Sequence, residues 1–156
     1  MTVGTQINFD RLISLVDDWL CLSGCKQEVV AQVCESNFTS INMKVLKYVE
    51  PVEFERYINK CEFIISHAGM GSILTALRVK KPIIIFPRRA DFGEHRNDHQ
   101  LATASSFANV PGIYVVNNKD ELFDLLSDSD GLGFGELKDS DDYKKLLAKI
   151  NYILEN

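Results

Sequence analysis

The sequence contains no long apolar run and no excess of positive charge. No apolar stretch approaches the roughly 18 residues that cross a bilayer, and the N-terminus lacks the basic-then-apolar pattern of a secretion signal. Seventeen lysines and arginines stand against 22 aspartates and glutamates, for a formal charge of −5, which argues against nucleic acid as a partner. We therefore expect a cytoplasmic protein whose attachment to a membrane comes through a partner.

Cysteine is scarce too, and the four that occur do not have the spacing of a metal site. Cys21 and Cys25 have no second Cys or His pair downstream at zinc-finger distance. In the cytoplasm we expect the cysteines, which include Cys34 and Cys61, to stay reduced and to pack as small apolar groups. The sequence also lacks internal repeats and low-complexity segments. With 156 residues, 46% of them apolar, we expect one domain over residues 1–156.

What the sequence does have is a regular alternation of short apolar strands with amphipathic helices. Gly24 is a plausible helix stop, Asn118 a plausible helix cap, and residues 128–138 the most loop-like segment. The alternation favours an α/β fold, a Rossmann-like, mostly parallel sheet with helices on both faces. The expected strands begin at Thr2 and cover 28–33, 43–49, 63–66, 83–86 and 113–116, and the expected helices cover 9–20, the residues from Pro51, those after Ser72, those after Gln100, 119–126, and a last helix near Ser140 with Leu154 on its apolar face.

Two polar loops follow strands of this expected sheet. Ligands of parallel sheets bind outside the carboxyl ends of the strands, where the strand order reverses. Glycines there let a ligand approach the backbone, and a helix N-terminus attracts anions, so phosphate is the expected ligand. Two alternatives stay open: the glycines serve tight packing only, or His67 is a structural histidine. The loops consist of Gly4, Thr5 and Gln6 after the first strand, and of His67, Ala68, Gly69, Met70, Gly71 and Ser72 after the fourth.

A denser polar cluster follows the next strand. Arg88 and Arg89 are placed to offset the charge of a diphosphate, or to serve a partner interface. If the next helix has begun by His95, then His95 and His99 share one of its faces. The alternatives are a solvated helix start and a zinc pair that lacks a third ligand. The ionisable and amide residues of this cluster are Glu94, His95, Asp98, His99 and Gln100.

Three motifs in order resemble the glycosyltransferase family 28 C-terminal domain. They are Val3-Gly4-Thr5 with the helix start at 9–13, then His67-Ala68-Gly69-Met70-Gly71-Ser72, and then residues 93–100. The likeness is greatest to stand-alone bacterial exopolysaccharide proteins, and the chain is also similar to the soluble catalytic subunit of the dolichol-pathway UDP-N-acetylglucosamine transferase. The resemblance implies one half of a GT-B fold, which binds the nucleotide-sugar, while a separate membrane-anchored subunit binds the acceptor.

The resemblance also implies roles for individual residues. Thr5 and Gln6 match the phosphate-side loop, and Asp98, His99 and Gln100 match the sugar-contacting segment, to which Glu94 and His95 are added here. The implied phosphate and nucleotide residues are Gly4, Thr5, Gln6, His67, Ala68, Gly69, Met70, Gly71, Ser72, Thr75, Arg88 and Arg89. Thr75 departs from relatives that carry Asp or Glu there, and Lys80 replaces the more usual Gly at the helix end, which costs about 1 kcal/mol if its φ is positive.

The implied reaction moves a sugar from a UDP-sugar to a lipid-diphosphate-linked acceptor in cell-surface polysaccharide synthesis, on the cytoplasmic face of the membrane and without a bound metal or other cofactor. His67 is the best catalytic candidate, but no general base is assigned, and the base lies on the partner if this chain binds only the donor. Two other hypotheses stay open. The chain is a non-catalytic accessory subunit that stabilises a membrane-bound transferase, or it is a metal hydrolase built on the histidines.

Overall fold

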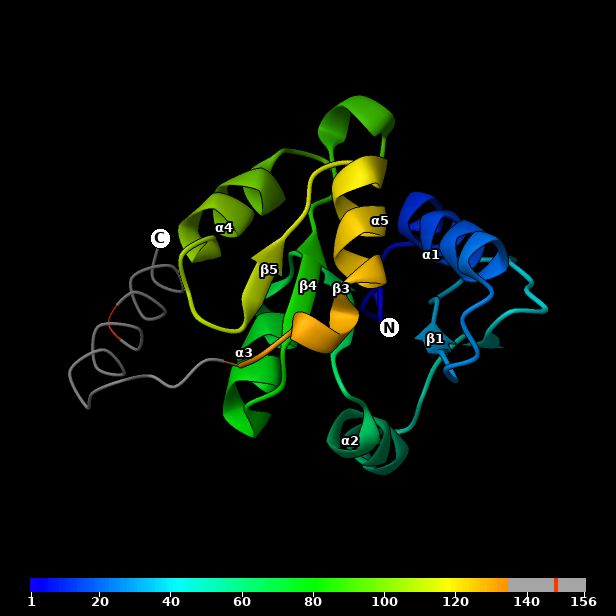
Figure 1. Ribbon diagram of the computed structural model, residues 1–156. Helices are drawn as coiled ribbons and strands as arrows, with labels where there is room; N and C mark the ends of the chain where they lie inside the picture. Colours follow the sequence, from blue (N-terminus) through cyan, green and yellow to red (C-terminus); the bar gives the residue numbers. More distant parts are fainter. Residues whose placement is uncertain (135–147, 149–156) are drawn as a thin grey trace.

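The computed structural model describes residues 1–134 and residue 148. Its strands are all parallel and pair in two groups, β1 (Val30–Gln32) with β2 (Lys44–Leu46), and β3 (Ile64–His67) with β4 (Ile83–Phe86) and β5 (Ile113–Val115). Thr2 joins the groups by parallel bridges to Gln32 and Ser66. The sheet order is therefore β2, β1, the segment at Thr2, β3, β4 and β5 (Figure 1).

The strand order reverses at the segment that contains Thr2. From there the chain builds outward through β1 and β2, then crosses back to β3 on the other side of Thr2 and continues through β4 and β5. Backbone hydrogen bonds hold the segment on both sides, from Thr2 N to Ile65 O at 2.9 Å and from Val3 N to Gln32 O at 3.1 Å. This is the switch point at which doubly wound sheets bind ligands.

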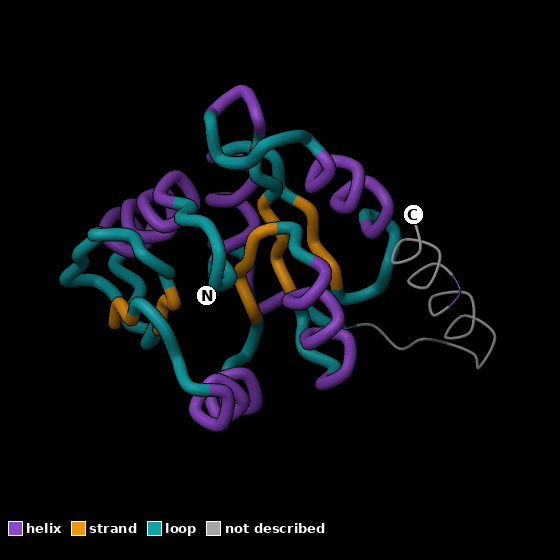
Figure 2. The backbone as a smooth tube through the Cα atoms, turned by 180° about the vertical axis from the view of Figure 1, so that it is seen from behind, coloured by secondary structure: helices purple, strands orange, loops and turns teal. Residues whose placement is uncertain are grey.

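Helices cover both faces of the sheet, and alternate strand residues point to opposite faces. Ile65, Ile84 and Phe86 pack against α1 (Asp10–Ser23) and α5 (Lys119–Ser127). Their neighbours on the strands pack against α2 (Pro51–Lys60), α3 (Met70–Val79) and α4 (His99–Phe107). Helix α5 lies in front of the sheet in Figure 1, and α3 lies in front of it in the reversed view of Figure 2. The predicted fold class is confirmed.

The helix ends follow local sequence signals. Gly24 ends α1 with φ 63°, and the Asn118 side chain accepts a hydrogen bond from Glu121 N at 2.9 Å, as predicted. Lys80 ends α3 with φ 54°, the positive angle that a glycine would adopt without strain. Among the described residues, no helix has both the length and the apolarity needed to cross a membrane.

Several predicted boundaries were wrong. The strands expected at 28–33 and 43–49 are only three residues long each, although a backbone hydrogen bond from Cys34 N to Lys47 O continues the contact beyond them. Helix α4 begins at His99 and not at His95, since residues 93–98 form turns and bends. Ser129–Gly131 forms a short 3-10 helix, η2, inside the segment predicted as loop. The remainder of that loop beyond residue 134 and the helix predicted near Ser140 lie outside the described residues.

Candidate functional site

The two glycine loops meet around the ring of His67, which ends β3. A Cβ atom on Gly4 would lie 2.9 Å from Cε1 of His67, and one on Gly69 would lie 2.2 Å from Nε2. The imidazole is therefore wedged between two residues without side chains. Gly4 also has φ +83°, so it turns the chain out of the sheet at this point. The structure thus brings the first and fourth loops together at the switch point, as the sequence predicts.

Gly71 differs from the other two glycines, because packing does not require it. A Cβ atom there would meet no heavy atom of the described residues within 4 Å, and the residue is exposed. It lies in the first turn of α3. The first amide of this helix that donates an intrahelical hydrogen bond is Ile73 N, which donates to Gly69 O at 3.2 Å. The helix-opening amides of Met70, Gly71 and Ser72 thus have no intrahelical acceptor. Open space next to these amides fits an anion.

The environment of His67 keeps its imidazole neutral. Burial, followed by the nearby charge of Arg88, lowers the pKa of His67 to about 4. The ring nitrogen Nδ1 lies 3.3 Å from the hydroxyl of Ser66. Near neutral pH the ring therefore offers a hydrogen-bond donor and acceptor, but no charge. Ala68, the next residue, is buried in the core under α3, so only its backbone faces the loop.

The remaining residues of the predicted phosphate set differ in how many of their polar side-chain atoms are available to a ligand. Thr5 and Gln6 are exposed on the loop that follows Gly4. The hydroxyl of Thr75 donates to Gly71 O at 2.8 Å, so this residue binds its own helix and keeps only lone pairs for a ligand. Arg89 is partly exposed, with its guanidinium 5.1 Å from the ring centroid of Phe92.

Arg88 has a structural role that the sequence prediction missed. Its side chain is buried, with 3% of the residue exposed. Nη2 donates to Val3 O at 2.8 Å and also to Ile7 O, so the guanidinium ties both ends of the first loop together. We predicted that Arg88 offsets the charge of a diphosphate, which stays a prediction. In the structure Nη2 donates to backbone carbonyls, Nε has no hydrogen-bond partner among the described residues, and the charge of Arg88 lowers the pKa of His67.

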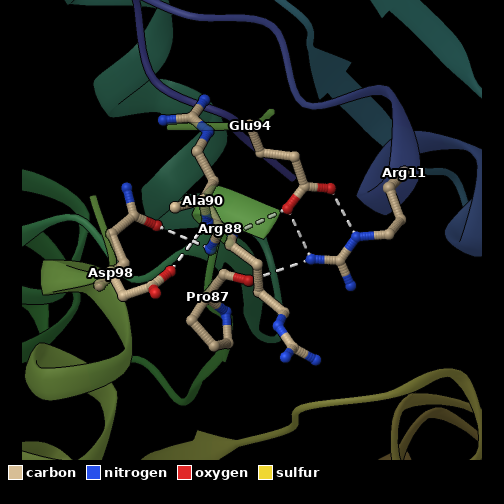
Figure 3. A network of polar contacts seen from close by, with 8 residues as sticks. Arg11, Pro87, Arg88, Ala90, Glu94 and Asp98 are labelled. Carbon is tan, nitrogen blue, oxygen red and sulfur yellow. Dashed lines mark hydrogen bonds and ion pairs between the residues drawn. The ribbon is translucent and has the colours of Figure 1, made fainter. Parts of the chain in front are cut away.

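The polar cluster after β4 mostly binds its own backbone. Three consecutive amides donate to it: Arg88 N to Oε1 of Gln100 at 3.1 Å, Arg89 N to Oε2 of Glu94 at 2.9 Å, and Ala90 N to Oδ1 of Asp98 at 2.8 Å. Figure 3 shows Glu94 and Asp98 turned toward this stretch. The strand has ended, and amides without a strand partner need acceptors.

Two residues of the predicted sugar-contact set also have partners within the protein. Both carboxylate oxygens of Glu94 accept from Arg11, from Nε at 2.5 Å and from Nη2 at 2.7 Å (Figure 3). The Gln100 oxygen accepts from Arg88 N, and the residue is only 3% exposed. Asp98 retains its second oxygen. Because these oxygens satisfy buried or half-buried donors, Glu94 and Gln100 have structural roles in addition to the predicted sugar contact.

His95 and His99 lie side by side, although no helical turn joins them. Their ring centroids are 4.4 Å apart in an edge-to-face arrangement, and Nδ1 of His99 pairs with Oδ1 of Asn97. Desolvation, the neighbouring His99 and the charge of Arg88 lower the pKa of His95. Within residues 1–134 no three histidine, cysteine, aspartate or glutamate side chains gather closely enough to hold a metal ion.

Sequence reasoning missed Arg11, which binds Glu94 and also donates to Pro87 O at 3.2 Å. One signal was available. Arg11 lies in the first turn of α1, where a cation opposes the helix dipole and an anion is preferred. A basic residue at such a position suggests a specific partner, but nothing local identifies it.

A separate hollow of about 530 Å³ lies at the opposite, amino edge of the sheet. Its lining comes from the strands and from α2, including Val30, Phe54, Tyr57 and Ile64. None of the residues predicted to bind the ligand line it, and ligands of parallel sheets bind at the carboxyl edge. We therefore place the candidate site at the carboxyl edge, around His67 and Gly71.

Comparison with known proteins was made by sequence and by structure. The model of the glycosyltransferase family 28 C-terminal domain matches residues 1–126. A UDP-N-acetylglucosamine transferase subunit ALG13 of Candida albicans is 30% identical over 73 residues, which are 47% of this chain and 24% of the relative. The subunit of the same name from Cryptococcus neoformans is 42% identical over 48 residues, 30% of this chain and 24% of the relative. The match thus spans about a quarter of the length of these relatives.

Solved structures show the same fold at low identity. The glycotransferase of kitacinnamycin superposes with a TM-score of 0.61 at 15% identity, over 96% of this chain and 37% of its own. The spinosyn forosaminyltransferase SpnP gives 0.56 at 18% identity, over 96% and 38%. The glycosyltransferase SnogD of Streptomyces nogalater gives 0.51 at 16%, again over 96% and 38%. The chain therefore has the fold of one part of these larger glycosyltransferases, in agreement with the predicted half of a GT-B fold.

Proposed function

Since this chain belongs to the glycosyltransferase family 28 C-terminal domain family, we propose that it binds a UDP-sugar as the donor-binding, catalytic subunit of a two-component glycosyltransferase. The relatives named ALG13 are subunits of a UDP-N-acetylglucosamine transferase, which supports both the donor class and the existence of a partner. The proposed unit is a single domain over residues 1–156. The partner is a membrane-anchored subunit that binds a lipid-diphosphate-linked acceptor, and it recruits this chain to the cytoplasmic face of the membrane for cell-surface polysaccharide synthesis.

The observation that carries the proposal is the open space at Gly71. It adjoins the amides that open α3, two residues after Gly69, which frames His67 together with Gly4 of the first loop. In the proposed complex the diphosphate lies against these amides and against Thr5 and Gln6, without a metal ion. The positive end of the helix dipole, at the N-terminus of α3, stabilises the negative charge that develops on the departing UDP. The nearby charge of Arg88 contributes to the same stabilisation.

The proposed complex assigns the sugar to the segment after β4. His95, His99 and the free oxygen of Asp98 lie there with polar groups available, and His95 is close enough to contribute to the lowered pKa of His67 in the glycine-framed loop. His67, neutral near pH 7, donates a hydrogen bond to the diphosphate or the nucleoside. The general base that activates the acceptor hydroxyl belongs to the partner in this scheme, because the acceptor lies on that side.

Calorimetry on the purified chain tests the proposal. Wild type is titrated with UDP, UDP-glucose, UDP-galactose, UDP-glucuronate and UDP-N-acetylglucosamine. We expect binding of UDP and of at least one UDP-sugar, and we expect Gly71→Trp to abolish it, because the indole fills the open space beside the amides. Gly131→Trp is the matched control, since Gly131 is also exposed, has no positive φ and lies outside the site. No binding by wild type at millimolar nucleotide concentration would refute the proposal.

Reconstitution then separates catalysis from an accessory role. The chain is added to membranes of the source organism that lack it, with a labelled UDP-sugar. A catalytic subunit predicts that His67→Ala and Gly71→Trp abolish transfer to lipid. If both variants restore most of the transfer, the chain is an accessory subunit, and the catalytic proposal fails while donor binding is judged by the calorimetry alone.

A further inference from the structure

The ion pair between Arg11 and Glu94 is the most tightly connected polar group that the proposed function does not use. It joins residues 83 positions apart, through two hydrogen bonds of 2.5 and 2.7 Å. The two side chains are only 25% and 11% exposed. A two-pronged, charge-assisted contact in such a half-buried place is stronger and more directional than an exposed ion pair.

The guanidinium of Arg11 is contacted from several sides, so its position is well defined. This group lies 4.4 Å from the ring centroid of Phe86 at the end of β4, and 4.9 Å from that of Phe92 in the short 3-10 helix Ala90–Phe92 that follows β4. Nη2 also donates to Pro87 O at 3.2 Å. The residue belongs to the first turn of α1, directly after the loop that begins at Gly4. Arg11 therefore connects the first loop, the end of β4 and the loop above it.

Glu94 connects Arg11 to the segment that follows the turn. Its Oε2 atom accepts from Arg89 N at 2.9 Å, and its own amide donates to Arg89 O at 3.2 Å. The turn between 89 and 94 is thereby closed at both ends. Directly after it come His95, Asp98 and His99, which keep polar atoms that could face a sugar. In Figure 3 the Glu94 carboxylate faces Arg11 on one side and the β4 loop on the other.

We propose that Arg11 and Glu94 are positioning residues for the sugar half of the donor: they hold residues 95–99 at a set place relative to the diphosphate loops, and thereby determine how far a UDP-sugar is preferred over UDP alone. This inference rests on the proposed function. The diphosphate loops do not need the pair in the same way, because Arg88 ties the loop at 4–7 and the two glycines frame His67 independently.

The test compares two affinities in each variant. Glu94→Gln keeps an oxygen that can accept from Arg89 N, but it removes the charge and the two-pronged contact with Arg11. We expect the Kd of the best-bound of the four UDP-sugars to rise about tenfold, since small misplacement of a binding group is costly, while the Kd of UDP stays within about threefold. Arg11→Gln should have the same effect, and the double variant no more than either alone, because the two residues act as a unit.

The matched control is Glu35→Gln, which breaks the ion pair of Lys47 and Glu35. These charges lie 3.5 Å apart with 56% and 61% of the side chains exposed, and neither residue belongs to the predicted donor site. Both affinities should remain at wild-type values. Thermal unfolding checks that each variant is folded, and if Glu94→Gln does not fold, Arg11→Lys replaces it, because it keeps the charge and loses the planar fork.

The outcomes separate the inference from the function on which it rests. If wild type binds no uridine nucleotide, the proposed function fails, and this inference with it. If wild type binds UDP and a UDP-sugar, but the variants weaken both equally, the pair has a general structural role and the inference alone is overturned. Unchanged affinities for both ligands overturn it as well. The inference is supported if the variants lose affinity for the UDP-sugar but not for UDP, and if the double variant loses no more affinity than either single variant.

Discussion

Two polar regions follow strands of one sheet, yet they are built in opposite ways. The first region is the pair of loops at 4–6 and 67–72, and the second is the segment at 87–100. The pair of loops depends on glycines, which have no side chain. Gly4 and Gly69 make room for His67, and Gly71 leaves space beside free amides. The segment at 87–100 works by side chains that accept hydrogen bonds from its own backbone. A polar cluster after a strand can therefore serve the fold, and only the partners of each oxygen tell which role it has.

Acidification is expected to affect the first region most. The pKa of His67 is lowered to about 4 from an ordinary value of 6.5, so the unfolded chain binds more protons than the folded chain between these values. The stabilisation is then complete above about pH 6.5 and is lost as pH falls toward 4, by up to about 3 kcal/mol.

Urea unfolding between pH 4 and pH 7 measures this effect. His67→Gln serves as the reference, because it stays neutral while the other titrating groups, His95 among them, are kept. Parallel pH profiles of the two proteins would show that the glycine-framed ring is not desolvated as described.

A second change tests the packing of the same ring. Gly69→Ala would place a Cβ atom 2.2 Å from Nε2 of His67, and the ring cannot retreat because Gly4 lies on its other side. We expect a loss of about 2 kcal/mol in unfolding free energy from this overpacking. Adding His67→Ala to Gly69→Ala should recover most of the loss, which a double-mutant cycle measures.

Gly71→Ala is the matched comparison for Gly69→Ala. Its Cβ atom meets nothing, and alanine is the better helix former, so the unfolding free energy should rise slightly. Equal losses at the two positions would remove the distinction between a glycine needed for packing and one that faces open space.

A loss smaller than that of Gly69→Ala is expected in the second region. Asp98→Ala removes the acceptor of Ala90 N and should cost about 1 kcal/mol of stability, whereas Asp98→Asn keeps an acceptor and should cost much less. Urea unfolding measures both. If Asp98 also binds the sugar through its free oxygen, Asp98→Asn weakens UDP-sugar binding in calorimetry without this stability loss. Equal stability of all three proteins would show that Asp98 does not support the loop.

The parts of the site that depend on local pattern were predictable. The glycines between a strand and a helix and the ends of α1 and α5 follow from residues close together in the chain, and the meeting of the first and fourth loops follows from the common edge of a parallel sheet. Arg88 was assigned to the diphosphate because a cation there can offset its charge, and Glu94 was assigned to the sugar because carboxylates bind sugar hydroxyls. Their actual partners are the carbonyls of Val3 and Ile7, and Arg11, which are distant in sequence.

The sequence by itself determined the α/β class, the order of the elements and the position of the glycine loops after their strands, because strand and helix periodicity and turn-forming glycines act over a few neighbouring residues. The tertiary structure decided which glycine makes room for a ring and which faces open space. It also decided that Glu94 and the Gln100 oxygen bind the protein itself. The physical reason is that amides released at the end of β4 must find acceptors, and a pattern read along the chain does not show which side chains reach them.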